Sequence, residues 1–202
     1  MIKKSFTLAE VLISVVIVGI IATCMVVSVK KSDYLTESYK KAGASTLLQI
    51  NYSTKQILAK YSYSYQMTGL KTLAGAKFSI TASGADANLA ELYKKVLGTK
   101  SYSAPSTYTG ADLVNEAGSK VGSYKVSSFA QGFQIKNGTY FAIKLNGNCT
   151  TSESYIYDPS ARDIRTASNS CGLIFFDVSA HDGPNIVGVD QYIVSIGKMG
   201  IK

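Results

Sequence analysis

The chain has 202 residues, 46% hydrophobic and 17% charged, so it can bury a core and is too apolar for a disordered polyelectrolyte. Three cysteines are too few for a miniprotein built on disulfides, and one histidine excludes sites that need two imidazoles. Of the net charge of +8, residues 30–100 carry +7, with 11 lysines against four acids, whereas residues 101–202 are balanced.

The first element is an apolar run from Phe6 to Val29, which contains one charged residue, Glu10, and no proline. About 20 apolar residues span a bilayer as a helix, since the backbone in lipid must satisfy its own hydrogen bonds. The run is longer than the apolar core of a cleavable signal peptide and ends at Lys30 without a small-residue cleavage site. We therefore predict a membrane-spanning helix over 6–29, with a secretory signal or simple anchor as the alternative.

Glu10 needs an explanation, because a carboxylate inside a bilayer costs about 3 kcal/mol and usually has a partner. The run contains no Lys, Arg or His. Cleavage between Ser5 and Phe6 would create an α-amine about one helical turn from Glu10, or against it on a neighbouring helix. Phe6 and Glu10 are thus candidates for a contact between subunits.

The segment Lys3-Lys4-Ser5-Phe6-Thr7-Leu8-Ala9-Glu10 resembles the leader junction of type IV prepilins and type II secretion pseudopilins. The resemblance implies that a prepilin peptidase removes residues 1–5, that Phe6 is N-methylated, and that Glu10 aligns subunits in a helical filament. It also implies an inner-membrane assembly platform, other pilin subunits and, before assembly, the lipid bilayer as partners. The chain would cross the cytoplasmic membrane once, with its head outside the cytoplasm. Two departures from the family pattern are Ser5 in place of the usual Gly and the lack of proline in the apolar run.

An amphipathic continuation of this helix is predicted over residues 30–61, because apolar side chains recur there at spacings of three and four. The stripe comprises Leu35, Tyr39, Ala42, Thr46, Ile50, Thr54, Ile57 and Tyr61, widened by Leu47 and Leu58. The lack of a Pro or Gly/Ser-rich linker between Val29 and Leu35 favours one continuous helix over a separate core helix. Gly43 is expected to bend it slightly.

Residues 62–202 read as a globular head. A helix is expected from Asp86 as N-cap to Gly98 as C-cap, with a Glu91–Lys95 pair, and a shorter one over 111–117. Asn137-Gly138 between two apolar segments predicts a hairpin of Phe129–Ile135 and Thr139–Leu145. Further strands are expected at Tyr155–Tyr157, Leu173–Val178 and Tyr192–Ile196. The predicted class is α+β: a long N-terminal helix, its first half spanning the membrane, packed on a four- or five-stranded antiparallel sheet, as in pilins.

Cys149 and Cys171 lie in polar segments near strand ends. A disulfide between them would close a loop of about 23 residues and add roughly 3 kcal/mol. Two free thiols in a reducing cytosol are the alternative, and the export-type N-terminus favours the bond. Cys24, inside the apolar run, is expected to be a small buried hydrophobe.

The segment 177–190 resembles a C-terminal loop of many pseudopilin-like proteins, matching it at Gly183-Pro184-Asn185, Gly188 and Asp190. Ser179-Ala180 stands where those proteins have Asn-Gly. In major pseudopilins a loop in this part of the sheet binds calcium, which makes the oxygen donors Asp177, Asp182, Asn185 and Asp190 a candidate calcium site. The favoured alternative is that these side chains hydrogen-bond to backbone N–H groups of a tight Gly-Pro turn.

The residues favour no enzyme. His181 stands alone in a polar loop, and Gly197-Lys198 lacks the first Gly and the Ser/Thr of a phosphate loop. Lys30, Lys31, Lys40 and Lys41 suit anionic lipid or subunit contacts better than nucleic acid. We therefore expect a structural subunit of a type IV pilus or type II secretion pseudopilus. The alternatives are a membrane-anchored extracytoplasmic binding module that does not polymerise, and a DNA-uptake pilin. No role is predicted for Tyr61–Tyr65.

Overall fold

The computed structural model describes residues 8–80, 84–102, 119, 126–158, 163–180 and 182–201. The chain divides into two compact units, Met1–Ser38 and Tyr39–Lys202. The helix expected over 111–117 lies outside the described residues. The described elements are helices and antiparallel strands, so the α+β class is confirmed.

Helix α1 covers Leu8–Tyr61 and has 54 residues. The backbone between Val29 and Leu35 is helical, as the absence of a linker sequence predicts. In the part of the chain that the structure describes, no helix combines the length and the apolar character needed to cross a membrane.

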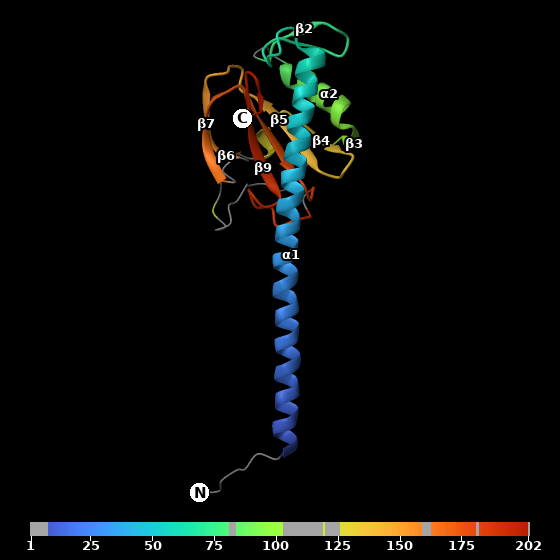
Figure 1. Ribbon diagram of the computed structural model, residues 1–202, viewed down its shortest axis with the longest axis vertical. Coiled ribbons are helices and arrows are strands. Elements are labelled where there is room, and N and C mark those ends of the chain that lie inside the picture. Colours follow the sequence, from blue (N-terminus) through green and yellow to red (C-terminus); the bar gives the residue numbers. More distant parts are fainter. Residues whose placement is uncertain are drawn as a thin grey trace. The chain divides into compact units, whose positions relative to one another are not determined.

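Tyr39–Lys202 carries the remaining elements, labelled in Figure 1 where there is room. In chain order they are β1 (Leu70–Lys71), β2 (Lys77–Phe78), α2 (Ala85–Leu97), β3 (Thr99–Tyr102), the 3-10 helix η2 (Val126–Ser128), β4 (Gln131–Ile135), β5 (Tyr140–Leu145), β6 (Thr151–Asp158), β7 (Asp163–Ser170), β8 (Gly172–Asp177), β9 (Gln191–Gly197) and β10 (Gly200–Ile201).

Within the described residues the main sheet has six strands in the order β10-β9-β8-β5-β4-β3, all antiparallel, so the prediction of four or five strands is wrong. The two edge strands were missed because β10 has two residues and β3 is a short polar segment, Thr99–Tyr102, with no alternating apolar pattern. The strand expected at Tyr155–Tyr157 is part of β6, which pairs with β7 in a separate two-stranded sheet. A third sheet pairs β1 with β2.

The hairpin predicted at Asn137-Gly138 is confirmed. Gly138 has φ of 95°, its N–H donates to Ile135 O over 2.9 Å, and Asn137 Oδ1 accepts the N–H of Thr139 over 3.0 Å. This tight turn sets the register of β4 on β5, in which Phe133 faces Phe141.

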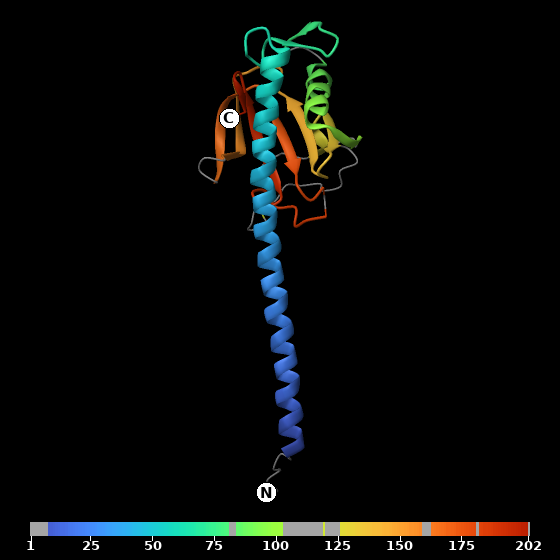
Figure 2. The same cartoon turned by 45° about the vertical axis from the view of Figure 1, so that its right-hand side comes forward.

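Both faces of the main sheet are covered, and alternate residues of each strand enter different clusters. On one face, Phe141, Phe176 and Tyr192 join a core with residues of α1 and α2. On the other, Tyr140, Phe175 and Ile193 pack with β6 and β7 residues such as Ile156. Figure 2 shows α1 and α2 over the first face. Burial on both sides explains why Gly172–Asp177 is buried at every position.

Within Tyr39–Lys202, α1 is buried from Gly43 onward, at Gly43, Thr46, Leu47, Ile50, Ser53, Thr54, Ile57 and Leu58. The predicted stripe is therefore correct in its second half, whereas Ala42 is exposed. Gly43 brings α1 close to the sheet, because a β-carbon there would overlap the ring of Tyr192. The role of Gly43 is therefore to permit close packing of α1 on the sheet. From the sequence we expected only a slight bend at Gly43 and did not predict this contact.

Helix α2 begins two residues earlier than expected, with Gly84 at the N-cap, so Asp86 is not the capping residue. Asp86 Oδ1 instead accepts the N–H of Leu145 over 2.7 Å and ties α2 to the end of β5. Glu91 pairs with Lys94 at 2.7 Å instead of Lys95. Gly98 ends the helix as predicted, its N–H donating to Lys94 O.

Candidate functional site

The predicted processing site, Ser5 and Phe6, lies outside the described residues. Glu10 falls in the first turn of α1, which begins at Leu8, and its side chain lies outside the described part of the chain. The cleavage, the methylation of Phe6 and the contact between Phe6 and Glu10 therefore remain predictions.

The loop between β8 and β9 brings together three of the four calcium candidates. Asp177 ends β8 and Asp190 immediately precedes β9, and both are fully buried. Asn185 lies between them in the loop, whereas Asp182 is exposed. The antiparallel pairing of Asp177 with Gln191 sets this spacing.

Asp190 organises the loop by accepting hydrogen bonds at both carboxylate oxygens. Its Oδ1 accepts the N–H of Ile186 over 2.8 Å, and its Oδ2 accepts the N–H of Asn185 over 2.9 Å and the hydroxyl of Ser179 over 3.2 Å. Burial raises the pKa of Asp190 and the charge of Asp177 raises it further, while these hydrogen bonds lower it. The net direction is upward.

Asp177 has a similar arrangement on the other side of Ser179. Its Oδ1 accepts the backbone N–H and the hydroxyl of Ser179, over 2.9 and 2.8 Å. Its Oδ2 accepts from Gln191 Nε2 over 3.3 Å, and the same Nε2 lies 3.0 Å from Asn185 Oδ1. The hydroxyl of Ser179 has one proton and so donates to one of the two carboxylates at a time.

These contacts do not form a calcium cage. Ca²⁺ takes six to eight oxygen ligands, whereas the oxygens of Asp177, Asp190 and Asn185 face N–H and O–H donors. The geometry agrees with the alternative interpretation, in which the side chains hold a tight Gly-Pro turn. Calcium binding thus has no support in the described arrangement.

Two residues of this network, Ser179 and Gln191, were not predicted. Ser179 occupies the position where the resembled loop has Asn, and a short polar side chain beside Asp177 is the signal that could have found it. Gln191 follows Asp190 directly, but its contact with Asp177 depends on strand pairing across 14 residues. Sequence spacing alone does not reveal such a contact.

Tyr192 connects the loop to the core. Its hydroxyl donates to Val189 O over 2.8 Å, and its ring stacks on Phe176 with centroids 4.9 Å apart. Tyr157 meets the same ring edge-on at 4.9 Å. Burial raises the pKa of Tyr192, with the charges of Tyr157 and Asp190 adding to the rise. The loop is therefore held by side chains that also build the sheet.

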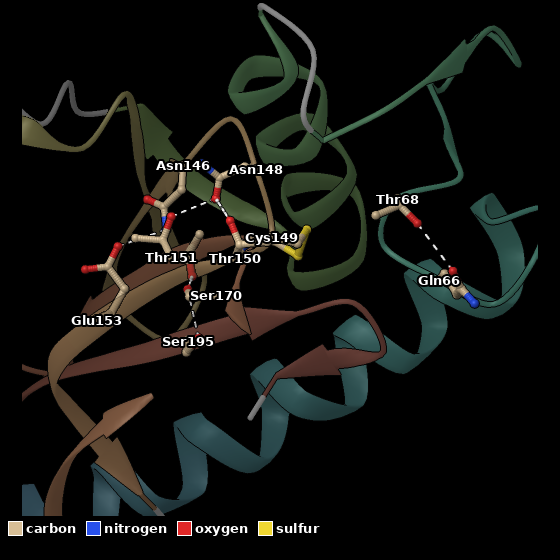
Figure 3. Close-up of a disulfide and its surroundings, with 12 residues drawn as sticks. Gln66, Thr68, Asn146, Asn148, Cys149, Thr150, Thr151, Glu153, Ser170 and Ser195 are labelled. Atoms are coloured by element: carbon tan, nitrogen blue, oxygen red, sulfur yellow. Dashed lines mark hydrogen bonds between the residues drawn. A yellow bond between two sulfur atoms is a disulfide. The ribbon is translucent and has the colours of Figure 1, made fainter. Parts of the chain in front are cut away.

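Cys149 and Cys171 form the predicted disulfide, which links the segment after β5 to the residue before β8. Both cysteines are buried. Cys171 N donates to Ile196 O over 2.7 Å, and Cys171 O accepts from Asn146 N over 3.0 Å. Figure 3 shows the bond and the polar residues around it, including Asn146, whose Nδ2 donates to Glu153 Oε1 over 2.8 Å.

The described side chains of 8–201 include no group of three or more His, Cys, Asp or Glu arranged to hold a metal ion. The described part of Tyr39–Lys202 thus contains a braced β8–β9 loop and the Cys149–Cys171 disulfide. In comparisons with known proteins, no family model, no curated protein and no solved structure matches this chain.

Proposed function

We propose that the chain is a filament subunit of the type IV pilin or type II secretion pseudopilin kind, made as a membrane-held precursor with a five-residue leader. The observation that carries the proposal is the junction from Lys3 to Glu10, followed directly by a helix that begins at Leu8. Proteolysis between Ser5 and Phe6 supplies the cation that the acid of the apolar run otherwise lacks.

The described architecture supports this function. A subunit that is held by its N-terminal helix needs a head stable enough to present a constant surface. Here α1 contributes Leu47, Ile50, Ile57 and Leu58 to the core under the sheet, so the same helix that carries the junction also anchors the head. The disulfide between Cys149 and Cys171 suits a domain exposed to an oxidising compartment.

Processing is tested by expressing the full chain in cells that contain a prepilin peptidase and measuring the mass of the purified product. We expect a chain that starts at monomethylated Phe6. A product that still starts at Met1 contradicts the proposal, and it favours the membrane-anchored binding module.

Assembly is tested with Glu10→Ala, and Glu10→Asp serves as the matched control because it keeps the carboxylate. The Ala variant should insert and be processed normally, but its filament yield should fall about tenfold or more. Without the carboxylate, the α-ammonium of Phe6 has no partner, and an unpaired intramembrane charge costs about 3 kcal/mol. Glu10→Asp should retain most of the yield. Equal yields from the wild type and the Ala variant would exclude a register-setting role for the acid.

A further inference from the structure

Besides the β8–β9 loop, Tyr39–Lys202 has an exposed surface at the end of α1, next to Tyr61. It consists of Lys60, Tyr63, Tyr65, the β1–β2 hairpin and the turn 72–76 that joins the two strands, and we refer to it as the tip surface. Figures 1 and 2 both show this hairpin at the end of α1. It plays no part in the loop, the disulfide or the predicted processing site.

Two lysines face each other across the hairpin. Lys71 and Lys77 are register partners, a pairing of like charges that is unfavourable in a sheet. Their Nζ atoms lie 4.1 and 4.7 Å from the centroid of the Tyr63 ring, within the range of cation–π contacts. A third ammonium, of Lys60, lies 5.6 Å from the ring of Tyr61.

These positive charges are not balanced locally. The sequence has six lysines and no Asp or Glu between Ser38 and Ala85. Within the described residues, none of Lys60, Lys71 and Lys77 forms an ion pair with a carboxylate. The tip surface therefore concentrates positive charge that contacts aromatic rings and that no described carboxylate neutralises.

The turn between the lysines is apolar and exposed. Residues 73–77 are all exposed, and the side chain of Leu73 at 49% is a large hydrophobic group in water. The turn is tight, with Thr72 N donating to Ala76 O over 2.8 Å, Gly75 N to Thr72 O over 3.0 Å, and Gly75 at φ of 90°. A rigid turn holds Leu73 outward at little entropic cost on binding.

The surroundings of Tyr63 are also well braced. Tyr63 N donates to Gly69 O over 2.9 Å, and Ser62 Oγ accepts from Ser64 N and Gln66 N. Met67 and Leu70 are buried and fix this segment to the core. The half-exposed rings of Tyr63 and Tyr65 are thereby presented from a fixed base.

We propose that the tip surface docks on a bilayer that contains anionic phospholipid. Leu73 enters the headgroup–acyl boundary, the tyrosines lie at the interface where amphipathic rings are favoured, and Lys60, Lys71 and Lys77 contact lipid phosphates. Single-stranded nucleic acid fits less well, because the ring of Tyr63 carries two ammonium groups and is not an open stacking platform. The proposal rests on Tyr39–Lys202 and does not require filament assembly.

The test uses the full chain held in neutral phosphatidylcholine nanodiscs that are fixed to a sensor surface by the scaffold protein. Incorporation into the discs is scored first, so a failure of membrane anchoring is distinguished from a failure of docking. Vesicles of phosphatidylcholine alone, or of equimolar phosphatidylcholine and phosphatidylglycerol, then flow over the surface. We expect retention of the anionic vesicles only, weakening as salt increases.

Lys71→Ala/Lys77→Ala should weaken retention about 25-fold, since each basic residue near an anionic membrane contributes about fivefold. The matched control, Lys55→Ala/Lys95→Ala, removes two exposed lysines of the helices and should change retention less than about twofold. Leu73→Glu should also reduce retention. All of these side chains are partly or fully exposed, and circular dichroism verifies that the variants fold.

Equal retention of neutral vesicles, or an equal loss in both double variants, would overturn the proposal. A single-stranded oligonucleotide that displaces the vesicles at a lower phosphate concentration than phosphatidylglycerol itself would do the same, and it would assign the surface to nucleic acid.

Discussion

The ring of Tyr192 occupies the space that a side chain at position 43 would need, so glycine at this position lets α1 approach β9 closely. The end of the ring that meets Gly43 carries the hydroxyl, which also donates to Val189 O. Tyr192 thus joins the helix, the sheet and the β8–β9 loop.

Gly43→Ala should destabilise the head. A β-carbon there overlaps the ring of Tyr192, and overpacking a core costs about 1–3 kcal/mol, more than the gain of about 1 kcal/mol in helix propensity. We expect a net loss of up to about 2 kcal/mol in the free energy of unfolding, measured by denaturant titration of the full chain. Ser45→Ala, at an exposed position of the same helix, should change stability by less than about 0.5 kcal/mol. If both variants unfold at the wild-type denaturant concentration, the close approach is not a constraint.

Replacement of the disulfide by serines, Cys149→Ser/Cys171→Ser, should lower the free energy of unfolding by about 3 kcal/mol. The bond spans 22 positions and restricts the unfolded chain accordingly. A reductant should have a similar effect on the wild type and none on the double variant. Identical denaturation curves for the wild type with and without reductant would show that the bond contributes nothing to stability.

Ala180→Gly should stabilise the β8–β9 loop. Ala180 has φ of 48°, a left-handed conformation that costs an ordinary residue roughly 1–2 kcal/mol. Glycine adopts this conformation without that cost, but it loses more backbone entropy on folding, which offsets part of the gain. The expected net gain is about 0.5–1 kcal/mol. Ala130 is exposed and does not have a positive φ, so Ala130→Gly should instead destabilise the chain by about 0.5–1 kcal/mol. The same sign for both substitutions would contradict the strain assigned to position 180.

Glu153→Gln should change the pH dependence of stability. Burial raises the pKa of Glu153 above its ordinary value of 4.5, so the folded chain holds the proton more tightly than the unfolded chain. This contribution is complete below the unfolded pKa and is lost as pH rises through the folded pKa. Glutamine keeps an acceptor for Asn146 but does not ionise.

The stability of Glu153→Gln relative to the wild type should therefore increase as pH rises from about 4 to about 7. Denaturant titrations of both proteins across this range measure the difference. A constant difference would mean that Glu153 titrates alike in the folded and unfolded chains.

Local signals in the sequence predicted the elements that local chemistry controls. Asn137-Gly138 predicted a hairpin because few residues adopt the positive φ that the turn needs, and Gly98 predicted the end of α2 for a related reason. The apolar segments of β8 and β9 were found within one residue of their bounds. The disulfide between Cys149 and Cys171 was favoured over two free thiols because of the export-type N-terminus, and it is confirmed.

Features that depend on distant partners were missed. Asp86 looked like a helix cap, but it bonds to Leu145 N, 59 positions away, and Gly84 takes the cap position. The importance of Gly43 depends on Tyr192, which no spacing rule connects to it. In the β8–β9 loop, the residue types alone left calcium ligation and turn bracing open, because a carboxylate oxygen suits either role. Only the positions of the donors around Asp177 and Asp190 separate the two.

The disulfide also determines how the head responds to tension. A chain pulled from its ends cannot extend the stretch between Cys149 and Cys171 while the bond is intact, because the load passes through the two sulfur atoms. At about 3.4 Å per extended residue, these 22 positions withhold roughly 75 Å of contour length. Strands β6 and β7 lie entirely inside this protected stretch, so they bear no mechanical load even after the rest of the sheet has been pulled apart.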